Sequence, residues 1–153
     1  MITAVAAAIN GGNLLQPQLV KALIDENGTR QDIQPNVVAH PISPETSASM
    51  RTMLESVVAM PLRPKPQDYT AGGKSGTADV AVEGGYNTVE TIASFIGFAP
   101  ADDPDILILV KLDDAGGLTG TQAASPVVAS LIDNSLHYLN VRPDGPAYAR
   151  AGE

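Results

Sequence analysis

The chain has 153 residues, of which 44% are hydrophobic, 17% charged and 4% aromatic. This length and composition fit one globular domain with a modest core of Ala, Val, Ile and Leu, and they exclude a disordered chain. The formal net charge of −8 argues against a nucleic-acid partner, which needs a basic surface. Because there is no Cys, disulfides, thiol catalysis and Cys-ligated zinc are excluded.

The first forty residues predict the end of a helix followed by a hairpin. Residues 2–9 are apolar and run into Asn10-Gly11-Gly12, which is typical of a helix end. This segment is too short to span a membrane and lacks the basic start of a signal peptide. Because no capping residue precedes it, we expect the helix to begin upstream of Met1. Weak alternation over residues 18–38 around Asn27-Gly28 predicts a small hairpin with a two-residue turn.

A second helix is predicted to begin at Ser43-Pro44-Glu45, which offers a capping hydroxyl, a proline at the first helical position and an early acid. The apolar residues that follow lie on one helical face: Met50, Met53, Leu54, Val57 and Val58. Pro61 ends the pattern.

Three strands and a last helix are predicted in the remaining chain. The strands cover residues 70–80, 91–99 and 106–112, and the third is an almost unbroken apolar run. The connection at residues 99–104 is short enough for antiparallel neighbours, and residues 125–139 show a helical apolar stripe. This order predicts an α+β fold, an antiparallel sheet flanked by helices.

The first predicted strand contains Lys74, Ser75, Gly76 and Thr77, called here the 74–77 box. A phosphate-binding loop is excluded, because the position that needs its first glycine holds Asp68 and no helix is predicted after the box. In a strand, Lys74 and Gly76 share one face while Ser75 and Thr77 share the other. The box could bind an extended peptide at a sheet edge, with the ammonium polarising a hydroxyl or holding a carboxylate. A solvated, glycine-weakened strand with an incidental lysine is the alternative.

The box matches the Lys-[Thr/Ser]-Gly-Thr motif of penicillin-binding proteins and serine β-lactamases. The neighbouring segments resemble the transpeptidases in the same order: residues 3–12, 15–20, 71–78, 94–100, 103–104 and 123–127. The sequence of residues 94–100 resembles the transpeptidases and not the β-lactamases. The chain therefore resembles the C-terminal part of a penicillin-binding-protein transpeptidase domain of the class B type over about residues 1–140, followed by a tail at 141–153 that we expect to be flexible.

This resemblance implies a partial penicillin-binding-protein/serine β-lactamase-like fold and assigns roles to the box. Lys74 would support proton transfer and the substrate carboxylate, and the hydroxyls of Ser75 and Thr77 would contact that carboxylate. Gly76 would let the ligand lie against the strand. The backbone N–H of Thr77 would form half of an oxyanion hole. No metal and no cofactor are implied.

The family's nucleophile motif is missing. None of the Ser residues is followed by Lys three positions later, and no Ser-x-Asn occurs. Both motifs would lie upstream of Met1. Because acyl transfer needs an activated nucleophile, we expect the chain alone to be inactive and to supply the substrate-binding strand of a peptidoglycan D,D-transpeptidase. A non-catalytic peptide-binding or scaffold module of the same fold is the alternative.

The remaining polar residues are weaker candidates. His40 and His137 are interpreted as isolated, which favours loop or helix-surface roles over metal binding. Tyr86 and Asn87 are predicted in the loop after the box strand, where they either line the mouth of the binding groove or form a plain surface loop. The acidic turn at residues 102–105 lacks the spacing of a calcium loop.

The implied partners are peptidoglycan stem peptides ending in D-Ala-D-Ala, β-lactams and the missing N-terminal part of the domain. Because that part supplies two strands of the family's sheet, we expect an exposed edge and a homodimer or strand swap. The implied location is the extracytoplasmic face of the bacterial membrane, held there by a segment outside this chain.

Overall fold

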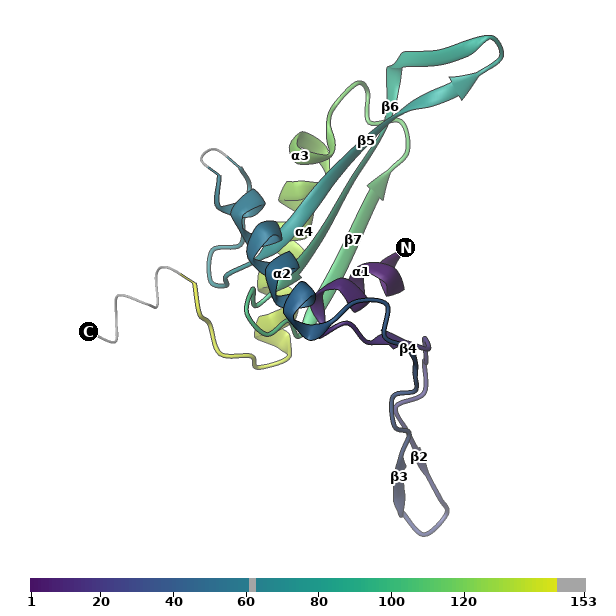
Figure 1. The fold of residues 1–153 in the computed structure, drawn as a ribbon, viewed down its shortest axis with the longest axis vertical. Coiled ribbons are helices and arrows are strands. Elements are labelled where there is room, and N and C mark those ends of the chain that lie inside the picture. The colour runs from purple at the N-terminus through teal and green to yellow at the C-terminus, as the bar shows by residue number, and fades with distance from the viewer. Residues whose placement is uncertain (61–62, 146–153) are drawn as a thin grey trace, which may run out of the picture. The chain divides into compact units, whose positions relative to one another are not determined.

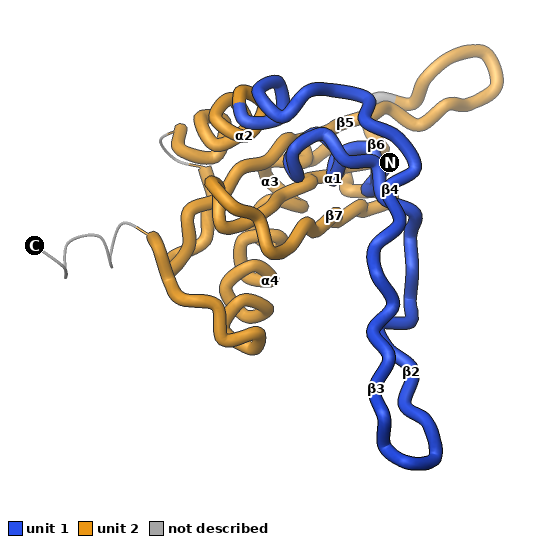
Figure 2. The backbone as a smooth tube through the Cα atoms, turned by 60° about the horizontal axis from the view of Figure 1, so that its bottom comes forward, with its two compact units in different colours: residues 1–48 blue, residues 49–153 orange. Residues whose placement is uncertain are grey.

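The structure is a computed structural model that describes residues 1–60 and 63–145 (Figure 1). It forms two compact units, unit 1 (Met1–Ala48) and unit 2 (Ser49–Glu153), coloured separately in Figure 2. The boundary between them falls within helix α2 (Pro44–Ala59). No helix in the described part is long and apolar enough to cross a membrane.

Unit 1 contains the helix and the hairpin that the sequence predicts. Its elements are α1 (Ile2–Ile9), β1 (Leu14–Leu15), β2 (Ala22–Ile24), β3 (Arg30–Asp32), β4 (Val37–Ala39) and the first turn of α2. β2 pairs antiparallel with β3, and β1 pairs antiparallel with β4. The helix end at Asn10 is followed by Gly11 and Gly12 with φ of 85° and 87°, values that favour glycine.

The predicted two-residue turn of the hairpin is wrong. Ile24 pairs with Arg30, so that the loop comprises residues 25–29. The physical reason is Asp25, whose carboxylate accepts hydrogen bonds from the backbone N–H of Asn27 and of Thr29. The bond from Thr29 is the main cause that holds the pKa of Asp25 below its usual value.

One buried serine connects α1 to α2 within unit 1. Ser47 has an exposed fraction of 0%, and its hydroxyl both donates to the carbonyl of Ala8 and accepts from the N–H of Gly11. A buried hydroxyl is stable here because both bonds replace those it loses to water.

Unit 2 contains the predicted antiparallel sheet. Its elements are the rest of α2, β5 (Gly72–Val82), β6 (Gly85–Ala99), β7 (Ile106–Leu112), α3 (Gly120–Ala123) and α4 (Ser125–Tyr138). The strand order is β5-β6-β7, with both pairs antiparallel. The predicted α+β fold is confirmed.

The core of unit 2 lies between the sheet and α4. It joins residues from α2, β6, α4 and the segments just before β5 and α4: Val58, Tyr69, Ala71, Phe95, Ala99, Ala124, Val128, Ile132 and Leu136. Alternate residues of β7 pack against this cluster, because successive side chains of a strand point to opposite faces.

The hairpin between β5 and β6 is longer than the sequence predicts. Tyr86 and Asn87 were expected in a loop, but they lie in β6, opposite Ala81 and Val80. Val82 pairs with Gly85, and Gly84 turns the chain between them with φ of 86°. The two adjacent glycines, Gly84 and Gly85, are typical of a loop, but here they form only the tight turn of the hairpin. The hairpin projects beyond the rest of the sheet, past a register shift between Asp79 and Val80 (Figure 1).

Part of the predicted tail makes specific contacts with the segment before β5. The hydroxyl of Tyr69 donates to the carbonyl of Val141, and the N–H of Gly145 donates to the carbonyl of Asp68. The carboxylate of Asp144 accepts from both the N–H and the hydroxyl of Thr70. Flexibility of the tail stays a prediction, and residues 146–153 lie outside the described part.

Candidate functional site

The 74–77 box lies on an edge strand, as predicted. Its four residues pair with β6 in the register Lys74↔Ile96, Ser75↔Phe95, Gly76↔Ser94 and Thr77↔Ala93. On its other side β5 pairs with no described strand. The outer edge of β5 can therefore form main-chain hydrogen bonds with an extended ligand.

The two faces of the box have different surroundings. Ser75 lies opposite Phe95, a core residue, so Ser75 and Thr77 belong to the face that carries α3 and α4. Lys74 and Gly76 belong to the opposite face. The alternation predicted from the sequence thus separates the cation from the two hydroxyls.

Lys74 is exposed, and its ammonium donates to the backbone carbonyl of Ser75 at 2.8 Å. Among the described residues it forms no ion pair, because the salt bridges there are Arg30–Asp32, Lys111–Asp113 and His137–Asp68. An exposed ammonium without a carboxylate partner can bind an external anion without first breaking a salt bridge.

Thr77 is exposed on the opposite face, and its hydroxyl oxygen accepts a hydrogen bond from the backbone N–H of Gly120 at 3.2 Å. Gly120 is the first residue of α3, which the sequence analysis missed. The signal was present: Thr119 and Gln122 form a capping box, in which each side chain bonds the backbone N–H of the other.

Gly73, which precedes the box, and Gly76, which lies within it, both face close contacts with β6. A Cβ on Gly73 would lie 2.6 Å from the ring of Phe95, and a Cβ on Gly76 would lie 2.6 Å from the hydroxyl of Ser94. At Gly73 the backbone carbonyl of Ile96 is almost as close, 2.7 Å from the same Cβ position. The two glycines therefore leave room for the neighbouring strand β6, both its side chains and its backbone.

The chain before the box is held to α4 by polar side chains. The carboxylate of Asp133 accepts from the backbone N–H of Gln67 at 2.9 Å and of Asp68 at 3.3 Å. His137, one turn further along α4, lies 2.7 Å from the carboxylate of Asp68 and packs edge-on against the ring of Tyr69. The interpretation of His137 as isolated is wrong, because the fold brings residues 67–69 to this helix.

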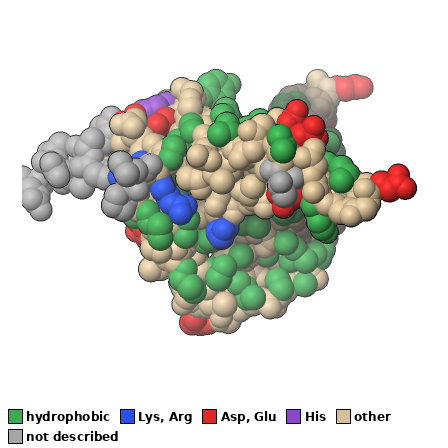
Figure 3. Space-filling model, turned by 90° about the horizontal axis from the view of Figure 1, so that it is seen from above, with side chains coloured by type: hydrophobic (Ala, Val, Ile, Leu, Met, Phe, Trp, Pro, Cys, Tyr) green, Lys and Arg blue, Asp and Glu red, His purple; other side chains and the backbone are tan. Residues whose placement is uncertain are grey.

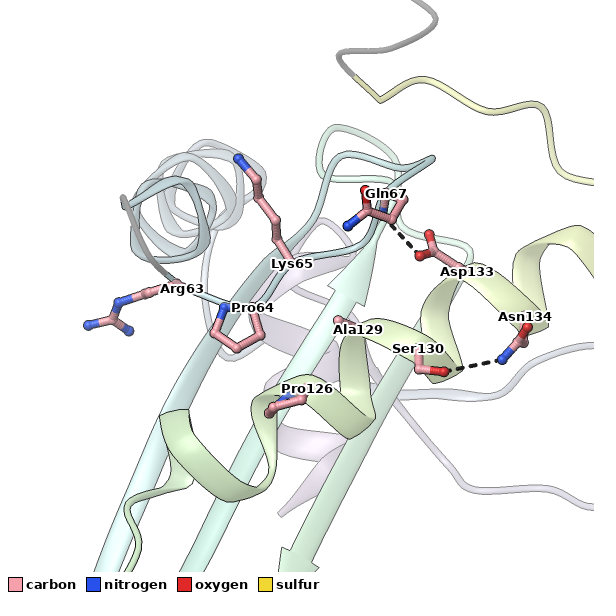
Figure 4. A pocket seen from close by; sticks show the side chains of 9 residues that line it. All are labelled: Arg63, Pro64, Lys65, Gln67, Pro126, Ala129, Ser130, Asp133 and Asn134. Carbon is pink, nitrogen blue, oxygen red and sulfur yellow. Dashed lines mark hydrogen bonds between the residues drawn. The ribbon is translucent and has the colours of Figure 1, made fainter.

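A groove of about 580 Å³ lies between residues 63–67 and α4. Figure 4 shows that the side chains of Arg63 and Lys65 extend away from each other, while Asp133 and Asn134 come from the helix. The two cations do not converge on one ligand, and no residue of the box lines the groove. This groove is therefore separate from the candidate site.

Neither clusters of positive charge nor groups of metal-binding side chains indicate a second site among the described residues. On the face drawn in Figure 3, the Lys and Arg side chains form only small, separated patches. Within residues 1–60 and 63–145, no group of three or more His, Asp or Glu side chains is placed to hold a metal ion.

Residues 1–133 match the family described as the penicillin binding protein transpeptidase domain. The chain belongs to this family, and the resemblance recognised in its sequence is confirmed. A solved relative is the transpeptidase domain of penicillin-binding protein 3 from Burkholderia pseudomallei, with a TM-score of 0.76 and 32% identity, covering 95% of this chain and 43% of that one. The fold is therefore that of a penicillin-binding-protein transpeptidase domain, in part.

Two curated relatives carry names that describe a function or process. Stage V sporulation protein D of Bacillus subtilis is 40% identical over 148 residues, which are 93% of this chain and 23% of that protein. A probable peptidoglycan D,D-transpeptidase, PbpC, of Pseudomonas aeruginosa is 32% identical over 119 residues, which are 74% of this chain and 21% of that protein. The chain thus spans less than a quarter of either relative.

Proposed function

We propose that the chain supplies the substrate-binding strand of a peptidoglycan D,D-transpeptidase. The observation that carries this proposal is the placement of the 74–77 box on a sheet edge that no described strand covers, with Lys74 exposed and in no ion pair with any described residue. The names of the relatives support the same reaction. Such an enzyme takes a stem peptide ending in D-Ala-D-Ala, releases the last D-Ala and passes the acyl group to an amine of another stem.

This proposal assigns a role to every residue of the box. Lys74 attracts the substrate carboxylate and supports proton transfer, while the hydroxyls of Ser75 and Thr77 bind the carboxylate. Gly76 lets the peptide lie along the strand. The backbone N–H of Thr77 contributes to the oxyanion hole, where negative charge develops on the attacked carbonyl. β-Lactams occupy the same positions.

Catalysis needs a nucleophile that this chain does not contain, because no Ser-x-x-Lys occurs in it. The isolated chain is therefore inactive and binds peptide without cleaving it. The alternative, a non-catalytic peptide-binding or scaffold module, shares this property of the isolated chain. A Ser-x-x-Lys motif upstream in the gene separates the two.

Replacing Lys74 with Ala is expected to weaken binding of a diacetyl-Lys-D-Ala-D-Ala peptide about tenfold, because a charge-assisted hydrogen bond is lost. The measurement is an NMR titration of the labelled chain, in which amide signals of residues 73–77 move. Lys65→Ala is the matched control and should leave the affinity unchanged. Equal affinity of the Lys74 variant and the parent chain would remove the proposed role.

We propose a second copy of the chain as a partner. The outer edge of β7 pairs with no described strand, and β7 is half-buried and apolar along almost its whole length. Such an edge favours pairing with an identical strand. Light scattering is expected to show a dimer at high concentration and less of it in Leu109→Lys. A strictly monomeric species at high concentration contradicts the pairing.

The proposed location is the extracytoplasmic face of the bacterial membrane, where peptidoglycan is cross-linked. The relatives named for peptidoglycan transpeptidation support this location.

A further inference from the structure

The first residue of α3, Gly120, lies so close to β5 and β6 that no residue with a side chain would fit there. A Cβ on Gly120 would lie 2.0 Å from the carbonyl oxygen of Ser94 and 2.5 Å from that of Gly76. Both are backbone atoms of the sheet, so they cannot move aside as a flexible side chain could. Glycine is therefore required at position 120 for space, and the contact holds α3 against β5 and β6.

Other bonds hold the chain before Gly120 in place without any ligand. The hydroxyl of Thr91 donates to the carbonyl of Leu118 at 2.9 Å, and the N–H of Ala115 donates to the carbonyl of Thr91 at 2.8 Å. The capping box of Thr119 and Gln122 fixes the first turn of α3. The N–H of Gly120 is thus fixed in position before a peptide binds.

The contact with Gly120 determines which way the hydrogen of the Thr77 hydroxyl points. A threonine hydroxyl has one hydrogen to donate and lone pairs to accept. The oxygen already accepts from Gly120, and no described residue accepts its hydrogen. The hydroxyl hydrogen points away from Gly120, and Thr77 is exposed, so this hydrogen is available to an external acceptor.

We propose that Gly120 is a positioning residue, whose N–H orients the Thr77 hydroxyl as a hydrogen-bond donor to the carboxylate of the bound peptide. This role rests on the proposed function, which supplies the peptide. It deepens that function by naming a residue outside the box that determines preference for a free C-terminal carboxylate. Removing the Gly120 contact would let the hydroxyl turn, so that its hydrogen no longer faces the ligand.

The test compares two probes, diacetyl-Lys-D-Ala-D-Ala and the same peptide with a C-terminal amide, by NMR titration of the full chain. The parent chain should bind the acid more tightly than the amide. Thr77→Val and Gly120→Ala should both lower this preference about five- to tenfold. Thr121→Ala, a change elsewhere in α3, should leave it unchanged.

The outcomes separate the two proposals. If Thr77→Val lowers the preference and a folded Gly120→Ala keeps it, the role of Gly120 is wrong while the proposed function stands. If the parent chain shows no preference for the acid, both are wrong. Should Gly120→Ala not fold, the parent chain decides: its Gly120 amide proton signal should move on adding the acid but not the amide. No such movement overturns the role of Gly120.

Discussion

Truncation of Phe95 to Ala is expected to lower the free energy of unfolding of unit 2 by about 3–5 kcal/mol, the usual cost of deleting a buried aromatic ring. Phe95 is 4% exposed and belongs to the core cluster with Val128 and Ile132. Its ring also covers Gly73, where a Cβ would come within 2.6 Å of it. The variant therefore leaves a cavity beneath the start of the box strand.

Urea unfolding followed by circular dichroism measures this loss. Val89→Ala is the matched control, because Val89 lies on the same strand and is 75% exposed. It should change stability by less than about 0.5 kcal/mol. In the Phe95 variant, the amides of residues 72–77 should also exchange with solvent faster than in the parent chain. Equal effects of the two substitutions would show that the Phe95 ring does not stabilise this core.

Much of the fold can be predicted because it depends on local patterns. The apolar run at residues 106–112 becomes β7 with the same bounds, and α2 begins at Pro44, within the predicted start signal Ser43-Pro44-Glu45. The box could be placed on a strand, and the alternation of its side chains follows from strand geometry alone. These features require no knowledge of distant contacts.

The contacts around the box could not be predicted in this way, because their partners are far apart in sequence. His137 with Asp68, Asp144 with Thr70, and Gly120 with Thr77 carry no periodic signal. Only the finished fold brings them together. α3 is different, because Thr119-x-x-Gln122 could have been recognised as a capping box.

Incubation of the isolated chain with a fluorescent penicillin is expected to produce no labelled band that survives denaturation. Covalent labelling needs a hydroxyl activated by a base. The ammonium of Lys74 bonds the backbone carbonyl of Ser75 and not a hydroxyl, and the hydroxyl of Ser94 donates to the carbonyl of Gly76. We therefore expect neither Ser75 nor Ser94 to react with the penicillin.

The solved transpeptidase domain of penicillin-binding protein 3 from Burkholderia pseudomallei, which is named for binding penicillin, is the positive control. A labelled band from the isolated chain would contradict the proposal of inactivity, and Ser75→Ala and Ser94→Ala would then show which hydroxyl reacted. Peptide binding without labelling is the combination that the box predicts. An open strand edge and an ammonium suffice to hold a carboxylate, whereas acyl transfer also needs a nucleophile and its base.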